Sequence, residues 1–108
     1  MRDQVRHLTD HDFDTAVQSG KWVVHFTSNN CPPCKAVKAI MAQLSGELPE
    51  LSFGELNAND NLKTVMVQQV GGYPTVILYA NGRPVDLLYG SKSASIYREK
   101  AQALAARG

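Results

Sequence analysis

Two short and nearly continuous apolar runs restrict the possible folds of this chain more than any other feature. The runs are WVVHF, within residues 21–27, and TVILY, within residues 74–80. A strand that is apolar at nearly every position, instead of every second one, is typical of a sheet covered on both faces. The chain must therefore supply helices for both faces, and the segments between the two runs do show helical periodicity.

The full order of predicted elements is β-α-β-α-β-α-β-β-α. The turn residues Asn81 and Gly82 predict an antiparallel hairpin, and strands that are separated by helices are expected to pair in parallel. We expect strands over residues 4–8, 21–27, 51–57, 74–80 and 84–89, and helices after Thr9 or Asp10, over 32–47, over 61–69 and after Ser93.

Each predicted helix has an apolar side that can pack on the sheet. The fold class is therefore α/β, with a mixed sheet of about five strands and helices on both faces, in a single domain over residues 1–108. The residues expected to face inward are Phe13, Ala16 and Val17; Val37, Ile40, Met41 and Leu44; Leu62, Val65 and Met66; and Tyr97, Ala101 and Leu104.

Composition and charge narrow the classes of function. The chain has 108 residues and a formal net charge of +1, without a basic run, which argues against nucleic acid or an anionic membrane as the main partner. The N-terminal MRDQVRHLTD lacks the apolar core of a secretory signal, and no apolar stretch is long enough to cross a membrane. We therefore expect a soluble, monomeric protein of the cytoplasm.

Both cysteines of the chain lie in the segment NNCPPCK, where a strand is expected to pass into a helix. Unsatisfied amides and the positive end of the helix dipole stabilise an anion at this point, so the pKa of Cys31 should be lowered. Cys34 follows about one turn later, close enough to attack a mixed disulfide on Cys31. The spacing predicts that Cys31 is the nucleophile and Cys34 the resolving thiol.

The two prolines between the cysteines fit this geometry. Neither Pro32 nor Pro33 has an N–H group, and amides in a first helical turn have no partner within the helix anyway. Both rings fix φ near the helical value, which should hold the two sulfur atoms at one separation. The Cys34 amide remains available for the sulfur of Cys31.

Other readings of the cysteine pair are a zinc site, an iron–sulfur cluster shared by two chains, and two inert core thiols. A zinc site requires about four ligands. The sequence has no second CxxC, and His7, His11 and His25 are not spaced like zinc ligands. Two prolines at a helix start do not bury a cysteine pair well. We therefore expect neither a metal nor an organic cofactor.

Four segments together resemble the thioredoxin family over nearly the whole length: VRHLTDHDFDTAV, WVVHFTSNNCPPCK, VGGYPT and YANGRPVDLLYG. The resemblance implies that Cys31 attacks and Cys34 resolves, with Pro33 as the family's proline before the second cysteine. It also implies a cis bond before Pro74, opposite the cysteines.

The resemblance further implies a docking surface for the substrate backbone. There an extended substrate pairs beside Pro74 by strand addition, with Tyr73 as a contact, and Gly90 lets the substrate approach closely. Such proteins reduce disulfides in other proteins and are themselves reduced by an external reductase or thiol donor.

The chain also departs from the family pattern. Asn30 and Thr27 stand where the family has tryptophans, Pro32 replaces a glycine, and Ala39 replaces a proline that kinks the helix. The family's buried aspartate, which assists proton transfer at the resolving cysteine, and its neighbouring lysine are replaced by His25 and Glu55.

Two readings of His25 stay open. It could be the base for Cys34, with Glu55 as its orienting partner, or a core histidine satisfied by one hydrogen bond. The function expected is reduction of protein disulfides. The alternatives are an oxidase or isomerase and, because the tryptophans are lost, a binding module with little redox activity.

Overall fold

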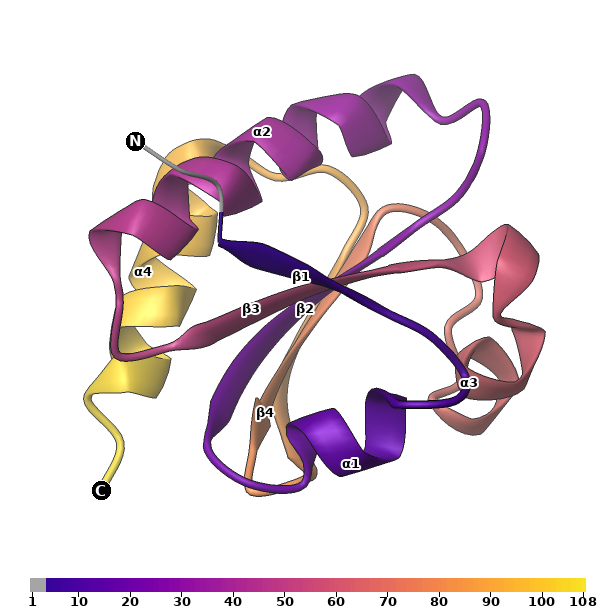
Figure 1. Cartoon of the computed structure of the whole chain (residues 1–108). Coiled ribbons are helices and arrows are strands. Elements are labelled where there is room, and N and C mark those ends of the chain that lie inside the picture. Colours follow the sequence, from indigo (N-terminus) through magenta and orange to yellow (C-terminus); the bar gives the residue numbers. More distant parts are fainter. Residues whose placement is uncertain (1–3) are drawn as a thin grey trace.

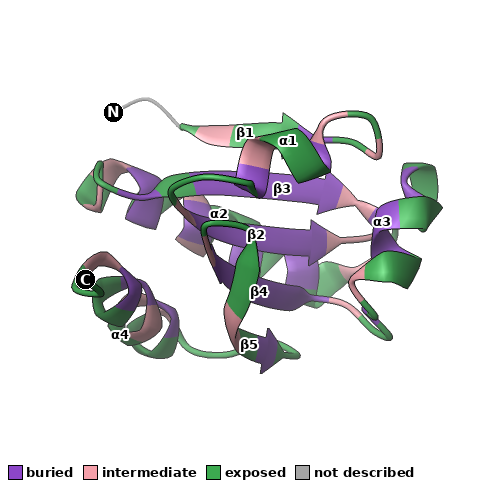
Figure 2. Cartoon of the chain, turned by 90° about the horizontal axis from the view of Figure 1, so that it is seen from below, coloured by how far each residue is buried: buried purple, intermediate pink, exposed green. Residues whose placement is uncertain are grey.

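The computed structural model describes residues 4–108 and contains a five-stranded mixed sheet, which confirms the predicted fold class. The strands lie side by side in the order β1-β3-β2-β4-β5, and those in the middle are largely buried (Figure 2). They are β1 (Val5–Leu8), β2 (Lys21–Thr27), β3 (Ser52–Asn57), β4 (Thr75–Ala80) and β5 (Arg83–Tyr89).

Helices cover both faces of this sheet, as predicted (Figure 1). One face packs against α1 and α3, and the other against α2 and α4. The helices are α1 (Phe13–Val17), α2 (Pro32–Glu47), α3 (Leu62–Val67) and α4 (Ala94–Ala105), with a short 3₁₀ turn η1 (Ala58–Asp60) before α3.

The direction of β4 differs from the sequence prediction. Strands β1 and β2 pair with β3 in parallel, but β4 pairs with β2 in the antiparallel direction although a helix separates it from β3. A helix of six residues spans only about 9 Å, whereas a six-residue strand spans about 20 Å. Since α3 is too short to carry the chain back along the sheet, β4 starts at the end where β3 stops.

The inner face of α3 also differs from the prediction. Val65 is buried as expected, but Leu62 and Met66 are exposed, and Asn61 and Thr64 are buried in their place. The start of α3 explains why a different side of the helix faces the core. There the Asp10 carboxylate accepts hydrogen bonds from the backbone amides of Lys63 and Thr64, at 3.3 and 2.8 Å. Asp10 therefore caps α3, whereas the sequence offered it as a possible cap of α1.

Two local predictions at chain reversals are confirmed. Asn81 and Gly82 both have positive φ, 51° and 84°, as the hairpin between β4 and β5 requires. The Ser93 hydroxyl accepts a hydrogen bond from the Ile96 amide and so caps α4. The hairpin places β5 beside β4 at one edge of the sheet.

Candidate active site

The two cysteines occupy the start of α2 and form a disulfide. Cys31 is the N-cap residue, Pro32 and Pro33 follow as the first two helical residues, and Cys34 completes the first turn. The S–S distance is 2.03 Å and the Cα atoms lie 5.2 Å apart. The Cys34 amide is not free for the Cys31 sulfur, as the sequence had suggested, because it donates to the Cys31 carbonyl at 3.0 Å.

The two thiols differ in accessibility in the predicted direction. Cys31 is partly exposed, whereas Cys34 is 3% exposed. A thiol at the helix N-terminus with access to solvent can meet a disulfide on another molecule. A buried thiol one turn later can react only with a disulfide on the neighbouring cysteine.

A network of asparagine side chains holds the loop that precedes Cys31, and it was not predicted from the sequence. The Asn29 amide donates to Asn59 Oδ1 at 2.8 Å, and Asn57 Nδ2 donates to Asn29 Oδ1 at 3.0 Å. Asn57 Oδ1 in turn accepts from the Asn59 amide at 2.9 Å. The clustering of asparagine in SNN and LNAND was the only available signal, and the partners depend on the placement of η1.

Pro74 lies at the same end of the sheet as the cysteines. The bond from Tyr73 to Pro74 is cis, as predicted. Thr75, the residue after Pro74, pairs with Phe26 near the end of β2 that leads to Cys31. The Gly90 amide donates to the Pro74 carbonyl at 2.9 Å, and Gly90 has a φ of 75°. The Tyr73 ring is half-buried and packs against the core under α1 and α3, so only part of it is accessible.

His25 and Glu55 lie side by side on the face of the sheet that α2 covers. The strand register places His7, Glu55 and His25 in one row across β1, β3 and β2. Glu55 is the neighbour of His25 as predicted, but its carboxylate lies 4.0 Å from His25 Nδ1, too far for a hydrogen bond. Neither ring nitrogen of His25 has a hydrogen-bond partner among residues 4–108.

The surroundings of His25 keep its ring neutral. The residue is fully buried, and burial, followed by repulsion from the Lys38 ammonium group, lowers the pKa of His25 from 6.5 to about 4. His25 is therefore uncharged at neutral pH.

A hollow of about 250 Å³ lies against the cysteines. It brings together the loop after β2, the first two turns of α2 and the end of β3. The residues that line it are Thr27, Ser28, Asn29, Asn30, Cys31, Cys34, Lys35, Lys38, Glu55 and Asn57. Glu55, and not His25, is thus the member of the pair that shares a wall with Cys34.

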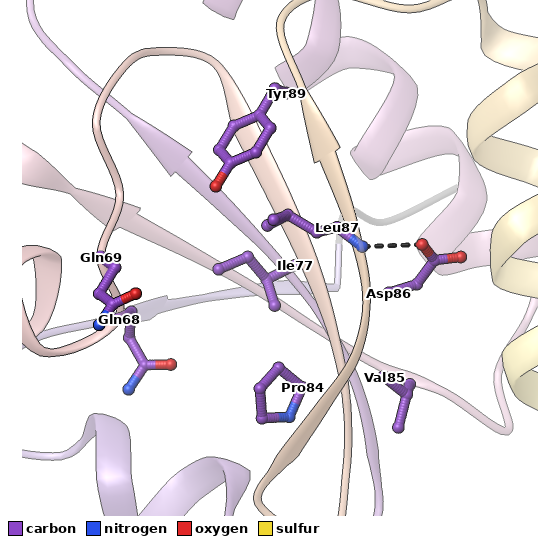
Figure 3. A pocket seen from close by; sticks show the side chains of 8 residues that line it. All are labelled: Gln68, Gln69, Ile77, Pro84, Val85, Asp86, Leu87 and Tyr89. Atoms are coloured by element: carbon purple, nitrogen blue, oxygen red, sulfur yellow. Dashed lines mark hydrogen bonds between the residues drawn. The ribbon is translucent and has the colours of Figure 1, made fainter.

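A second hollow, of about 430 Å³, runs along β5 on the opposite face of the sheet (Figure 3). Its walls are Ile77, Leu87, Tyr89, the end of α3 and the start of β5, and the Leu87 amide donates to the Asp86 carboxylate at 2.8 Å. Tyr89 directly precedes Gly90, so this groove begins beside Pro74. No cysteine is among the described residues that line it, and we assign the thiol chemistry to the first hollow.

Two further properties concern residues 4–108 as a whole. They contain no group of three or more His, Cys, Asp or Glu side chains placed to hold a metal ion. None of their helices has both the length and the apolar character that crossing a membrane requires.

A partly exposed cysteine at a helix N-terminus, joined to a buried cysteine one turn later, is the site of a thiol–disulfide oxidoreductase. The thioredoxin family model matches residues 4–102, which is most of the chain. The chain therefore belongs to the thioredoxin family, and the Cys31–Cys34 pair is its redox-active disulfide.

Individual relatives give the same result. The thioredoxin of Chlamydia pneumoniae is 32% identical over 88 residues, which cover 82% of this chain and 86% of the relative. The thioredoxins of Staphylococcus epidermidis and Staphylococcus aureus are each 32% identical over 84 residues, which cover 77% of this chain and 81% of each relative.

Proposed function

We propose that this chain reduces disulfides in other proteins and is reduced in turn by an external reductase or thiol donor. The observation that carries the proposal is the unequal exposure of the two thiols at the start of α2. The Cys31 thiolate attacks one sulfur of the substrate disulfide, and the other substrate sulfur leaves as a thiolate. Cys34 then attacks Cys31 Sγ, the second substrate thiolate leaves, and two electrons have passed to the substrate.

The substrate backbone is proposed to dock along the loop before β4. Pro74 and Gly90 are joined by a hydrogen bond at 2.9 Å, and Tyr73 precedes the cis bond. Pro32 and Pro33 form the opposite rim, at the exposed start of α2. An extended segment can lie between these rims and pair with the backbone beside Pro74.

The pair of His25 and Glu55 assists proton transfer at Cys34. It lies on the face of the sheet that α2 covers. The protein is a single-domain monomer of the cytoplasm, needs no organic cofactor at the site, and serves electron transport and redox homeostasis. A net charge of +1 supports a role without nucleic acid or membrane partners.

Two serine variants test the proposal. With Cys34→Ser, the resolving attack is lost, so mixed disulfides with substrate proteins should accumulate on Cys31. With Cys31→Ser, almost none should form. Gel shift under non-reducing conditions and turnover in an insulin-reduction assay with a thiol donor measure both effects.

The same assay can overturn the proposal. Turnover retained by both serine variants would contradict dithiol exchange, and absence of turnover in the wild type would favour a binding module with little redox activity. Faster labelling of Cys34 than of Cys31 by an alkylating reagent, in the reduced protein near neutral pH, would reverse the two roles.

A further inference from the structure

Glu55 lines the same hollow as both cysteines. It comes from β3, and its side chain is 10% exposed, so the carboxylate is largely shielded but still reaches the hollow. The volume of about 250 Å³ is large enough for water between this carboxylate and Cys34. A carboxylate with access to a buried thiol through water is placed to take a proton from it.

Three basic side chains surround the Glu55 carboxylate from three different elements. His7 Nδ1 on β1 lies at 3.9 Å, His25 Nδ1 on β2 at 4.0 Å, and Lys38 Nζ on α2 at 3.9 Å. Lys35 lines the same hollow. No second carboxylate is among the described residues that line the hollow.

His25 is less suited to this task. It is fully buried, is not among the residues that line the hollow, and has no hydrogen-bond partner for either nitrogen among residues 4–108. A proton on this ring would be a buried charge, with Lys38 on α2 disfavouring it further.

From this arrangement we infer that Glu55 is the residue that takes the proton from Cys34, through water in the hollow, while His25 is a neutral neighbour. In the resolving step the Cys34 S–H bond breaks and the proton passes to the Glu55 carboxylate. The electron pair left on sulfur forms the bond to Cys31 Sγ, and the bond from Cys31 to the substrate sulfur breaks. The proton then passes from Glu55 to solvent, and when a donor reduces the disulfide again the leaving Cys34 thiolate takes up a proton through water in the same hollow.

This assignment deepens the proposed function and rests on Cys34 being the resolving thiol. It also gives the exchange of the family's aspartate and lysine for His25 and Glu55 a chemical meaning. A carboxylate is kept under the resolving cysteine, but it comes from β3 instead of β2. The ring of His25 then fills the vacated position as a neutral neighbour at 4.0 Å.

Stopped-flow mixing of the reduced protein with dithiobis-nitrobenzoate separates the two steps. The first nitrothiobenzoate ion leaves when Cys31 attacks, at a rate that rises with reagent concentration. The second leaves when Cys34 attacks the mixed disulfide, at a rate that does not. Since this leaving group needs no proton, the second phase reports removal of the proton from Cys34.

For Glu55→Gln we expect a second phase at least tenfold slower at pH 7, since a positioned base typically contributes about 100-fold or more. Its rate should rise about tenfold per pH unit, because hydroxide must replace the carboxylate, whereas the wild-type rate should change little from pH 6 to 8. Glu55→Asp should recover part of the rate and the flat profile. Glu50→Gln, the same change at an exposed site, should match the wild type.

A second phase of Glu55→Gln that keeps the wild-type rate and pH profile would overturn the inference. So would a larger and equally pH-dependent loss in His25→Leu, since the histidine would then be the base. Far-ultraviolet circular dichroism of each variant verifies the fold, and the slope of the pH profile does not depend on the amount of folded protein. Absence of the first phase in the reaction of the wild type would instead contradict the proposed role of Cys31.

Discussion

The two faces of the central sheet are buried to a similar extent but treat their polar groups differently. Under α1 and α3 the rings of Phe13, Phe26 and Tyr79 pack together, with centroids 6.1 and 5.6 Å apart. The Tyr79 hydroxyl there donates to Gln68 Oε1 at 2.7 Å. Under α2, by contrast, His25 is fully buried with both nitrogens unpartnered among residues 4–108.

This difference separates a face built for stability from one that also carries chemistry. A buried polar group without a partner costs roughly 1–3 kcal/mol, and a site optimised only for stability would replace it. The unpartnered ring and the shielded carboxylate lie together, on the face that holds Cys34. Variants on each face can therefore test whether the two differ in the way the contacts indicate.

The largest effect is expected from truncating a ring on the face under α1 and α3. Phe26 is fully buried, and Phe26→Ala should lower the free energy of unfolding by about 3–5 kcal/mol, because it leaves a cavity. Denaturant unfolding of the oxidised protein measures this change.

Phe53→Ala is the matched control on the other face, since Phe53 is 2% exposed and belongs to the core under α2 and α4. A similar loss in both variants would mean that the apolar parts of the two faces are equivalent. A loss well below about 2 kcal/mol for Phe26→Ala would contradict the close packing described for that face.

The outlines of the fold could be predicted because local signals and tertiary structure agree there. The helix over residues 32–47 has the predicted bounds, since two prolines suit its first turn and Pro49 breaks the pattern after it. The inner face of α3 could not be predicted in this way. It depends on the cap from Asp10, which lies 54 residues from Thr64 in the sequence.

The same distinction between predictable and unpredictable features applies to the active site. Cys31, Cys34 and Pro74 stand at fixed places in the sequence relative to a buried strand, so their positions could be predicted. The contacts of Glu55 could not, because they require the register of three strands and the position of Lys38 on α2. Sequence alone placed His25 and Glu55 together but did not show which of them reaches the hollow.

A smaller and pH-dependent effect is expected at His25. In an unfolded chain its pKa is near 6.5, and in the folded protein it is about 4, so the unfolded state binds the proton more readily. The stability that comes from the neutral buried ring is complete above pH 6.5 and declines as the pH falls toward 4, by about 3 kcal/mol in total. His25→Leu should lose this decline and should be no less stable than the wild type at pH 7.

Urea unfolding of both proteins from pH 7 to pH 4 provides the measurement. Only the difference between the curves is attributed to His25, because carboxylates elsewhere affect both proteins alike. His11→Leu, at an exposed histidine, should leave the decline in place. Parallel curves for the wild type and His25→Leu would mean that the ring is already partnered or charged in the folded state.

The smallest effect is expected at the partnered polar group of the opposite face. Tyr79→Phe removes the hydroxyl that binds Gln68 and leaves the ring in place, so it should lower the free energy of unfolding by about 1 kcal/mol. Burial, and then the negative charge of Asp14, raise the pKa of Tyr79, so the phenol keeps its proton over the whole accessible range. The loss should therefore be the same at pH 5 and pH 8, in contrast to the pH-dependent change at His25. A double-mutant cycle with Gln68→Ala isolates the bond, and a coupling energy near zero would show that the hydroxyl is satisfied elsewhere. The two faces would then differ less in their treatment of polar groups than the hydrogen bonds indicate.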